Sequence, residues 1–492
     1  MIPVPGFEGR RIAVFGLGRS GLTAARALQA GGARPVLWDD SVSSRLQAEA
    51  EGFAVEDLTA ADWSGFAALV LSPGAPLTHP KPHWTVDKAR EAGIEVIGDI
   101  ELFARALAGL PEGHRPKVVA VTGTNGKSTT TALIGWVLKE AGLTVHVGGN
   151  IGIGVLALPA PTPDAVYVVE VSSYQLDLTT SFAPDVAILT NISPDHLDRH
   201  GGMEGYVAAK RRIFRAHGEG KVALVGIDDD WGKRVHKDLP SDGWATSILT
   251  NIAVIGGTGR LLGLPVARAR ERGEARANLF EQGRFITMEA LPGDLTADGI
   301  HLADLTAARS LPGRHNAQNA AFAYAAARAV GVPHDRAVQG LLTFPGLAHR
   351  METVGQLGRV RFVNDSKATN ADAARQALAS YPRSFWIAGG RAKAGGVDDL
   401  EDLFPRVVEA FLIGEAAGPF AARLGDTPHR ISGDMATAVR QAYEAAASTG
   451  RDEVVLLSPA AASFDQYPDF EARGEAFRAA VLALGATPAS AS

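Results

Sequence analysis

The stretch from Val118 to Ser128 reads Val-Val-Ala-Val-Thr-Gly-Thr-Asn-Gly-Lys-Ser. An apolar strand here runs into a glycine-rich turn, and a helix follows with Leu133, Ile134 and Val137 on one face. In such a strand–loop–helix unit, backbone N–H groups and the helix N-terminus converge on phosphate oxygens. The stretch therefore predicts a phosphate-binding loop in an α/β domain.

Two side chains of this loop suit a nucleoside triphosphate. Lys127 can neutralise the β- and γ-phosphates, and the Ser128 hydroxyl can bind Mg²⁺. The generic motif G-x-x-x-x-G-K-[ST] has glycine where Val121 stands, whereas this loop has Gly123, so it is a variant. The alternative is a glycine-rich turn with an incidental lysine. The order of strand, loop and helix favours the phosphate site.

Strand–helix alternation continues on both sides of the loop. At roughly 100–200 residues per domain, 492 residues predict about three domains. The segment between Trp231 and Gly313 shows only short β-like pieces and receives no assignment, and Ala108 to Lys117 is turn-rich and is expected to be a linker. The predicted strands are Ile12–Phe15, Pro35–Trp38, Ala67–Leu71, Val118–Val121, Ala165–Val171, Val186–Thr190, Val360–Val363, Phe385–Ala388, Val408–Ile413 and Val454–Leu457.

Composition excludes several classes of protein. Hydrophobic residues make up 46% and charged residues 21%, which excludes a largely disordered chain. The net charge of −6 gives no support for nucleic-acid binding, and the absence of cysteine removes disulfides, thiolate metal sites and cysteine nucleophiles. No run reaches the ~18 apolar residues of a membrane span and no signal peptide is visible, so we expect a cytoplasmic protein.

A second glycine-rich turn follows the first strand as Gly16-x-Gly18-x-x-Gly21. It fits a dinucleotide fingerprint, and Asp39 stands about 20 residues further on, where an acidic residue would bind a ribose. The alternative is a tight turn that only packs the helix on the strand. The pattern indicates a nucleotide of some kind but does not support hydride transfer.

Titratable side chains follow two strands of the central series. Glu170 ends an apolar strand beside the phosphate loop, where a carboxylate suits Mg²⁺, although an edge carboxylate facing water is the alternative. The loop from Asp195 to His200 carries five titratable groups, and its place beside the nucleotide unit singles out His196. Lys210 by itself indicates only a solvated helix lysine.

Several motifs resemble the Mur ligase family, in order, over nearly the whole chain. The resemblance lies in Thr122–Thr129, Gly149-Asn150-Ile151-Gly152, Glu170–Leu176, Asp195–Asp198, Gly313–Asn319, His349–Glu352, Asn364–Asn370 and Leu457–Tyr467. Asp365–Asn370 (Asp-Ser-Lys-Ala-Thr-Asn) and Phe470–Gly474 (Phe-Glu-Ala-Arg-Gly) resemble the family member that adds D-glutamate to UDP-N-acetylmuramoyl-L-alanine, rather than its sister enzymes. The resemblance implies an ATP-dependent amide ligase of peptidoglycan synthesis, and hence of cell wall biogenesis, cell shape and cell division.

The resemblance also implies roles for the matching residues. Lys127 and His196 would act in catalysis, as would Lys210, which matches the family's carbamylated lysine. A second Mg²⁺ would be held by Glu170, His196 and Lys210, beside the ion on Ser128. The implied ATP contacts are Gly123, Thr124, Asn125, Gly126, Lys127, Ser128, Thr129, Asn316, Arg350 and Asp365. The nucleotide-sugar would be held by Gly18, Asp39, Ser72, Pro73, Gly74 and Asn150, and D-glutamate by Thr369, Lys393, Ser463 and Phe470.

The family pattern is altered at two places. Its Gly-Gly-x-x-Lys-Gly stretch becomes Gly389-Gly390-Arg391-Ala392-Lys393-Ala394, so the lysine keeps its place but the next glycine is lost. The segment from Asp230 to Gly313 is longer than usual and does not align cleanly. The expected contacts of Thr369 and Lys393 with D-glutamate therefore rest on a changed neighbourhood.

The expected architecture is α/β with three domains. These are a Rossmann-like N-terminal domain for the UDP substrate (1–107), a phosphate-loop ATPase-like central domain (108–345) and a Rossmann-like C-terminal domain for the amino acid (346–492). We expect a monomer that uses ATP and Mg²⁺ without nucleic acid or membrane insertion. Three alternatives stay open: a sister ligase with another amino acid or folate, a nucleotide-dependent switch, and a dehydrogenase that uses the Gly16–Gly21 turn.

Overall fold

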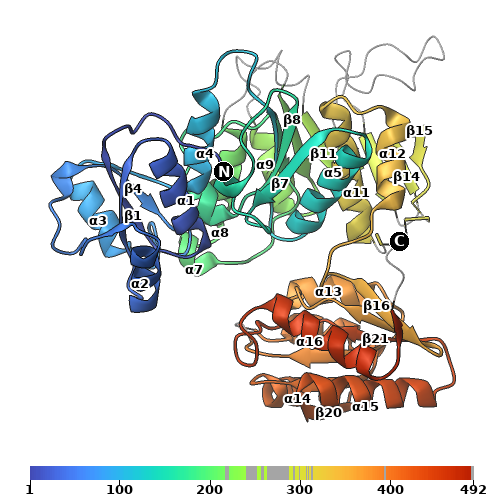
Figure 1. Cartoon of the computed structure of the whole chain (residues 1–492). Helices are drawn as coiled ribbons and strands as arrows, with labels where there is room; N and C mark the ends of the chain where they lie inside the picture. Colours follow the sequence, from blue (N-terminus) through green and yellow to red (C-terminus); the bar gives the residue numbers. More distant parts are fainter. Residues whose placement is uncertain are drawn as a thin grey trace, which may run out of the picture. The chain divides into compact units, whose positions relative to one another are not determined.

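The computed structural model describes most of the chain. It covers residues 1–215, 221–239, 314–392 and 395–488, with the short stretches 252–255, 260–262, 287–291, 294–297, 300–305, 307–308 and 310–311 between them. The chain forms two compact units, the first with residues 1–307 and 317–342 and the second with residues 308–316 and 343–492 (Figure 1).

The N-terminal sheet is parallel throughout, with strand order β3-β2-β1-β4-β5. The order reverses beside β1, and the Gly16–Gly21 turn follows that strand, at the point where open α/β sheets bind ligands. Its elements are β1 (Arg11–Phe15), α1 (Arg19–Ala30), β2 (Arg34–Trp38), α2 (Val42–Ala50), β3 (Ala54–Val55), β4 (Phe66–Leu71), α3 (Trp84–Glu91), β5 (Glu95–Ile97) and α4 (Asp99–Ala108).

The central sheet has the order β15-β14-β13-β12-β11-β10-β9-β6-β8-β7. Strands β6 to β11 pair in parallel, and β6 lies between β8 and β9, so the loops after these three strands share one edge. The elements of this parallel part that precede β11 are β6 (Lys117–Thr122), α5 (Lys127–Glu140), β7 (Thr144–Gly149), β8 (Ala165–Glu170), α6 (Ser173–Asp177), β9 (Val186–Leu189), α7 (Leu197–His200), α8 (Met203–Arg211), β10 (Val222–Gly226) and α9 (Asp230–Asp238).

The unassigned segment before Gly313 extends this sheet. Its strands β12 to β15 pair in antiparallel fashion beyond β11, away from the phosphate loop. They are β11 (Ile252–Ile255), β12 (Arg260–Leu262), β13 (Thr287–Leu291), β14 (Asp294–Ala297) and β15 (Ile300–Ala303), and α11 (Arg314–Ala329) and α12 (His334–Thr343) follow. These strands span only three to five residues each, too few for a periodic pattern to be readable.

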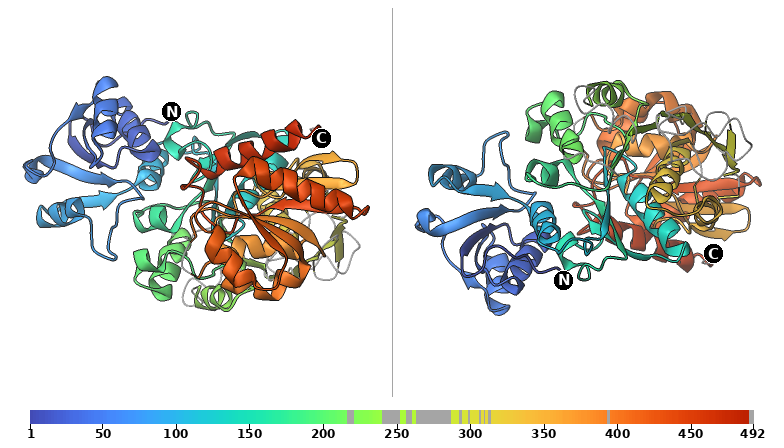
Figure 2. Two further views of the ribbon diagram at one scale, coloured as in Figure 1. Left: turned by 90° about the horizontal axis from the view of Figure 1, so that it is seen from below. Right: turned by 90° about the horizontal axis from the view of Figure 1, so that it is seen from above.

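The larger of two hydrophobic cores in the described part of the first unit connects its two sheets, and the smaller covers the other face of the N-terminal sheet. The larger core joins Leu28 of α1 and Phe103 of α4 to Tyr167 of β8 without a break, and the rings of Phe103 and Tyr167 lie 5.6 Å apart between centroids. The blue N-terminal strands and the teal to green central strands nevertheless form separate sheets in every view (Figures 1 and 2). Helix α4 therefore belongs to the packing of both sheets.

The second unit holds the C-terminal sheet, of order β20-β19-β18-β21-β17-β16-β22. Strands β17 to β21 are parallel, and helices cover both faces, so two separate cores form. The elements are β16 (Glu352–Leu357), β17 (Val360–Asn364), α13 (Ala371–Ala379), β18 (Ser384–Gly389), β19 (Val407–Ile413), α14 (Ala417–Leu424), β20 (His429–Gly433), α15 (Met435–Ser448), β21 (Glu453–Leu457), α16 (Phe470–Ala483) and β22 (Thr487–Pro488).

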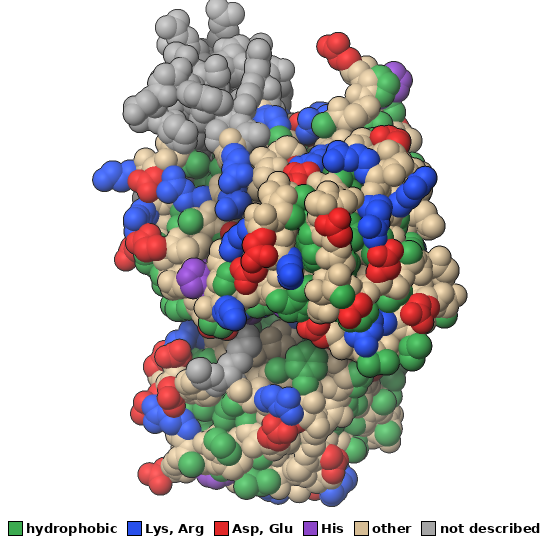
Figure 3. Space-filling model, turned by 90° about the vertical axis from the view of Figure 1, so that its left-hand side faces the viewer, with side chains coloured by type: hydrophobic (Ala, Val, Ile, Leu, Met, Phe, Trp, Pro, Cys, Tyr) green, Lys and Arg blue, Asp and Glu red, His purple; other side chains and the backbone are tan. Residues whose placement is uncertain are grey.

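The α/β fold and the three predicted strand–helix series are confirmed. Each predicted strand matches an observed strand within one or two residues at either end, and no helix or strand lies between α4 and β6, where a linker was expected. Among the described residues, no helix has the length and apolar character that crossing a membrane requires. On the face shown in Figure 3, Lys and Arg alternate with Asp and Glu, so that face carries no continuous basic patch.

Candidate active site

The phosphate loop joins β6 to α5 through two glycines that no other residue could replace without strain. Gly123 has φ +147°, and a Cβ there would lie 2.0 Å from Oγ1 of Thr190. Gly126 has φ +80°, and a Cβ there would lie 2.7 Å from Oδ1 of Asn319. Both glycines thus serve a left-handed backbone and a close approach at once.

The segment after β9 fixes the conformation of this loop. Thr124 N donates to the carbonyl oxygen of Asn191 at 2.9 Å, and Asn125 N donates to its Oδ1 at 2.8 Å. In return, Thr190 Oγ1 and Asn191 Nδ2 donate to the carbonyl of Asn125 at 2.7 and 3.0 Å. The loop is therefore held in place by side chains and backbone from the neighbouring strand.

The loop lysine and the hydroxyls after it lie at the N-terminus of α5. Lys127 Nζ donates to the carbonyls of Gly123 and Thr124 at 2.9 and 2.7 Å. Ser128 and Thr129 are buried in the first turn, and Thr129 Oγ1 has no hydrogen-bond partner among the described residues. Unfilled polar atoms at a helix N-terminus suit an anion and its bound cation.

Glu170 ends β8 directly beside the strand that carries the loop, paired with Val121. It is 1% exposed; Oε1 accepts a hydrogen bond from Asn150 Nδ2 at 2.7 Å, whereas Oε2 is buried without a partner in the described structure. An isolated buried carboxylate oxygen is costly, and a cation would remove that cost. The donor is of the hard oxygen type that Mg²⁺ prefers.

Lys210 of α8 is buried beneath the same loop. Its Nζ donates to the carbonyl of Gly123 at 2.7 Å and lies 4.5 Å from the centre of the Tyr206 ring. Burial lowers the pKa of this amine well below its usual value, and Lys127 lowers it further, while Asp195 and Glu170 oppose the change. The sequence indicated a solvated lysine, so its burial was visible only through the family resemblance.

The two histidines after β9 differ in environment. His196 precedes α7 with φ +54°, is 42% exposed, and places Nε2 3.4 Å from Oδ2 of Asp195. His200 is buried, hydrogen-bonds to Ser173 Oγ at 3.0 Å and stacks on Tyr174. His200 therefore has a structural role. In the described residues, no three His, Asp or Glu side chains gather closely enough to hold a metal by themselves.

The Gly16–Gly21 turn is organised by Asp39. Asp39 follows β2, and its Oδ2 accepts from Leu17 N at 2.6 Å. A Cβ on Gly16 would lie 2.4 Å from Cβ of Ser72, so the loop after β4 closes on the turn. Gly18 is exposed at the start of α1, where it leaves the helix N-terminus open.

Arg199 connects this region to the central sheet, a contact that sequence reasoning missed. Its guanidinium donates to the carbonyls of Gly74 at 3.0 Å and Pro73 at 3.3 Å, and it lies over the Tyr174 ring at 4.6 Å. The predicted nucleotide-sugar residues of the first sheet are thus tied to the loop that carries His196. Five titratable residues close together were the only available signal.

In the second unit, the buried carboxylate of Asp365 follows β17. Ser458 Oγ donates to Oδ2 at 2.9 Å and Met351 N donates to Oδ1 at 3.2 Å. Burial raises the pKa of Asp365 to about 7, against the lowering effect of Arg350 and these hydrogen bonds. Arg350 keeps a buried Nε without a partner among the described residues, and Asn316, in the same unit, is buried.

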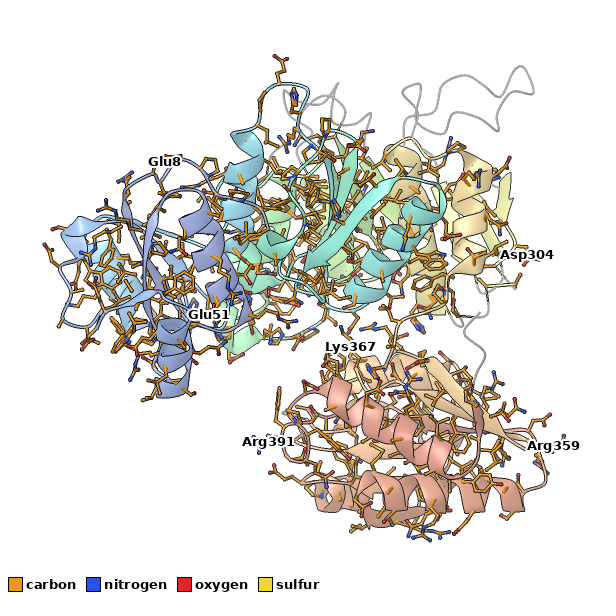
Figure 4. All side chains as sticks on the ribbon, viewed as in Figure 1. Glu8, Glu51, Asp304, Arg359, Lys367 and Arg391 are labelled. Atoms are coloured by element: carbon orange, nitrogen blue, oxygen red, sulfur yellow. The ribbon has the colours of Figure 1, made fainter. Side chains whose placement is uncertain are left out.

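The residues predicted for D-glutamate follow three adjacent parallel strands. Thr369 lies in the loop after β17, Ser463 is buried after β21, and Phe470 begins α16 with Lys367 Nζ 5.0 Å from its ring centre. Lys393, after β18, lies outside the described residues. Lys367 and Arg391, labelled in Figure 4, mark the loops after β17 and β18.

Arg473 holds these loops together, a role that sequence reasoning did not assign. Its guanidinium, 1% exposed, donates to the carbonyl of Ser366 at 2.8 Å, to that of Ala461 at 3.0 Å and to that of Gly389 at 3.4 Å. Burial lowers the pKa of Arg473 to about 10. The motif that contains it was recognised, but a buried arginine has no signature of its own.

The comparisons with known proteins all indicate the Mur ligase family. The sequence profile of the Mur ligase middle domain matches residues 121–253, and that of the Mur ligase glutamate ligase domain matches residues 349–461. The chain is 59% identical to the UDP-N-acetylmuramoylalanine--D-glutamate ligase of Caulobacter vibrioides, over 99% of the chain and 98% of the relative. The ligases of that name from Phenylobacterium zucineum and Rhizobium etli are 57% and 49% identical, each over 98% of this chain and 98% and 97% of theirs.

Solved structures share the fold at low sequence identity. UDP-N-acetylmuramate-alanine ligase MurC from Thermotoga maritima matches with a TM-score of 0.57 at 15% identity, covering 96% of this chain and 99% of that one. The MurF ligase of the same organism, in complex with ADP, matches with a TM-score of 0.55 at 17% identity, covering 97% and 96%.

Proposed function

The chain belongs to the Mur ligase family, and we propose that it joins D-glutamate to UDP-N-acetylmuramoyl-L-alanine at the expense of ATP. The reaction makes a peptidoglycan precursor. The observation that carries the proposal is the phosphate loop at Gly123–Ser128 beside the unpartnered carboxylate oxygen of Glu170, in a chain similar over its whole length to ligases of that name.

The chemistry proceeds in two steps. The carboxylate of the nucleotide-sugar attacks the γ-phosphorus of ATP, so an acyl phosphate forms and ADP leaves. The amine of D-glutamate then attacks the acyl carbon, the tetrahedral intermediate expels phosphate, and the amine loses a proton. Because phosphoryl transfer needs little covalent help from a protein, positioning and charge neutralisation account for most of the rate.

Lys127 and the N-terminus of α5 are proposed to hold the ATP phosphates. In the structure, Lys127 Nζ donates to two carbonyls of its own loop, which keeps its charge at the loop. The Thr129 hydroxyl, which has no partner among the described residues, completes this binding surface. Asn316, Arg350 and Asp365 are proposed to contact the rest of the nucleotide, and the unpartnered Nε of Arg350 supports this assignment.

Mg²⁺ fits the donor groups around the loop. Ser128 is proposed to hold one ion and Glu170, His196 and Lys210 a second, on the support of the buried, unpartnered Oε2 of Glu170. Bound there, Mg²⁺ would neutralise charge on the phosphoryl and carboxylate oxygens. Asn150 orients Glu170 by its hydrogen bond to Oε1.

Carbamylation of Lys210 is part of this proposal. Only the neutral amine adds to CO₂, and burial lowers the pKa of Lys210, which favours that form. The carbamate would place a negative charge near Glu170 and Lys127. That change would turn Lys210 into an oxygen ligand.

The two substrates are proposed to bind at separate sheets. Gly18, Asp39 and Ser72–Gly74 hold the nucleotide-sugar, at the switch point of the N-terminal sheet. Thr369, Lys393, Ser463 and Phe470 hold D-glutamate, at the loops after three adjacent strands of the C-terminal sheet. The proposed domains are residues 1–107 for the nucleotide-sugar, 108–345 for ATP and 346–492 for D-glutamate.

A phosphate-release assay tests the proposed function. With UDP-N-acetylmuramoyl-L-alanine and ATP present, D-glutamate should start phosphate release, whereas L-glutamate, alanine and a diamino acid should not. Turnover that is indifferent to the amino acid would instead indicate a nucleotide-dependent switch. Tight NAD binding, measured by calorimetry, would favour a dehydrogenase.

The acyl phosphate has a separate test. ¹⁸O placed in the carboxylate of the nucleotide-sugar should appear in the released phosphate, since that oxygen bridges carbon and phosphorus. Phosphate without ¹⁸O would exclude this intermediate. We further propose that the protein is cytoplasmic, because ATP and UDP-linked sugars are intracellular metabolites. We also propose that it is a monomer, which a mass of about 51.5 kDa by light scattering would support.

A further inference from the structure

Asp99 is a buried carboxylate to which the proposed chemistry gives no role. It begins α4 and is 4% exposed. Gln175 Nε2 donates to its two oxygens at 3.2 and 3.0 Å, and Ile100 N donates to Oδ1 at 2.9 Å. Burial raises the pKa of Asp99 and these hydrogen bonds oppose the rise. A group that is this costly to bury needs an explanation.

On one side, Asp99 belongs to the helix that packs against α1, and α1 follows the turn proposed for the nucleotide-sugar. Ile100 and Phe103 of α4 share one hydrophobic core with Leu22 and Leu28 of α1. Helix α4 therefore ties the Asp99 carboxylate to the helix that follows the Gly16–Gly21 turn.

On the other side, Asp99 fixes the orientation of Gln175. With Nε2 engaged by Asp99, Oε1 of Gln175 accepts from Ser172 N at 3.1 Å and Ser172 Oγ at 3.3 Å. Gln175 N donates back to Ser172 Oγ at 3.2 Å, so the pair forms the capping box at the start of α6. Ser172 stands two residues after Glu170, the proposed metal ligand.

We infer that Asp99 is a positioning residue, which sets the nucleotide-sugar turn against the segment that carries Glu170. The inference rests on the proposed function. The carboxylate of the nucleotide-sugar must lie in line with the γ-phosphorus of ATP, and small misplacements of reacting groups are costly in rate. Through the packing of α4 on α1 and its charge-assisted hydrogen bonds with Gln175, this one carboxylate links the two sites.

Glu101 supplies a matched control on the same helix. It is also a buried carboxylate, and it accepts from Thr180 N at 2.8 Å and Ser181 N at 2.9 Å, with Arg105 Nε at 2.9 Å. These contacts dock α4 on the loop before β9 and do not involve Gln175. Loss of Glu101 removes a comparable buried carboxylate but leaves the capping box intact.

The test compares Gln175→Glu, the double variant Asp99→Asn/Gln175→Glu, and Glu101→Gln in the full chain. Gln175→Glu sets two carboxylates face to face, so kcat/KM for UDP-N-acetylmuramoyl-L-alanine should fall about 100-fold, with little change in KM for ATP. In the double variant, the amide introduced at position 99 can donate to the carboxylate introduced at position 175, which should restore kcat/KM to within about tenfold of wild type. Glu101→Gln should lower the melting temperature and leave both KM values within about twofold.

Each other result counts against the inference. A double variant no better than Gln175→Glu, at a melting temperature equal to that of wild type, would show that the pair does not position the sites. If KM for UDP-N-acetylmuramoyl-L-alanine rose as much in Glu101→Gln as in Gln175→Glu, Asp99 would be only one of several equivalent contacts of α4. A wild-type chain without D-glutamate-dependent phosphate release would remove the proposed function itself, and the inference with it.

Discussion

The charge of Lys127 lies where the transferred phosphoryl group of ATP is proposed to bind. Its ammonium lies against the carbonyls of Gly123 and Thr124, at the N-terminus of α5. Lys127→Ala should lower kcat/KM for ATP by about 10²- to 10³-fold, because a preorganised charge on the transferred phosphoryl group is lost. Lys139→Ala, in the exposed last turn of the same helix, is the control. Equal activity of the two variants would contradict the assigned role.

Lys210 gives a prediction that tests whether activity requires a carboxylate-like group or a positive charge at this position. Lys210→Ala should lose nearly all activity and regain part of it in added formate or acetate, whose carboxylate can occupy the space of the carbamate. Lys210→Arg keeps the charge but should not respond to the same additives. Initial rates of each variant, measured with and without added formate or acetate, distinguish the two possibilities. Absence of rescue at any concentration would argue against carbamylation.

Asp365 gives a prediction for the dependence of stability on pH. Its pKa of about 7 in the fold lies above the unfolded value near 3.8, so the folded state binds the proton more tightly. Its contribution to the free energy of unfolding is then full below pH 3.8 and is lost as the pH rises through 7. Asp365→Asn should therefore gain on the order of 1–3 kcal/mol over wild type between pH 6 and pH 8, measured by urea unfolding. A constant difference across this range would contradict the raised pKa.

The site residues that could be predicted from sequence are those whose function follows from their spacing within one short segment. Gly123, Lys127 and Ser128 follow a strand and precede a helix, so their roles needed no long-range contact. Lys210 is different, because its burial depends on the Gly123 carbonyl, 87 positions away in the chain. Arg473, whose partners lie on three separate loops, could not be found by any local pattern.

The phosphate loop as an element depends on backbone shape as much as on its side chains. Gly123→Ala brings a Cβ to 2.0 Å from Thr190 Oγ1, so the loop must move and nucleotide affinity should fall at least tenfold. Gly142→Ala is the matched control, since Gly142 also has positive φ (+91°) but open space around it. The control should lose only about 1 kcal/mol of stability. ATP affinity by calorimetry distinguishes the two.

Strands could be predicted where the hydrophobic pattern continued over enough residues to show its period. The buried strands β6, β8 and β18 are continuous apolar runs, which is the pattern of a parallel sheet covered on both faces. The antiparallel strands after β11 are short and their partners lie in the same unassigned segment, so no period emerged. The exposed strand β20 was missed because four of its five residues are polar or glycine.

At the scale of the whole molecule, the two compact units should unfold separately. The first unit has a core that runs from α1 through α4 to β8 and another on the opposite face of its N-terminal sheet, whereas the second unit has cores of its own. Scanning calorimetry should therefore show two transitions, although the described residues form three sheets. Glu101→Gln should shift only the transition of the first unit. A third transition would show that the N-terminal sheet melts independently.

The three strand–helix series in the sequence correspond to the three sheets, and length alone had indicated that number. Sequence could not show that α4 and its buried carboxylates join the first two sheets into one unit. That fact depends on Asp99 and Glu101, whose partners Gln175, Thr180 and Ser181 lie about 80 positions away. A carboxylate in the first turn of a helix is ordinarily an exposed N-terminal charge.

The two-unit organisation makes this chain convenient for spectroscopy. Because the protein has no cysteine, every thiol introduced by mutagenesis is a unique attachment point for a dye or spin label. Leu46 on α2 and Leu482 on α16 are 59% and 40% exposed and lie one in each unit. A doubly labelled chain would report the distance between the units as a distribution, in solution and during turnover, with no native residue to mask first.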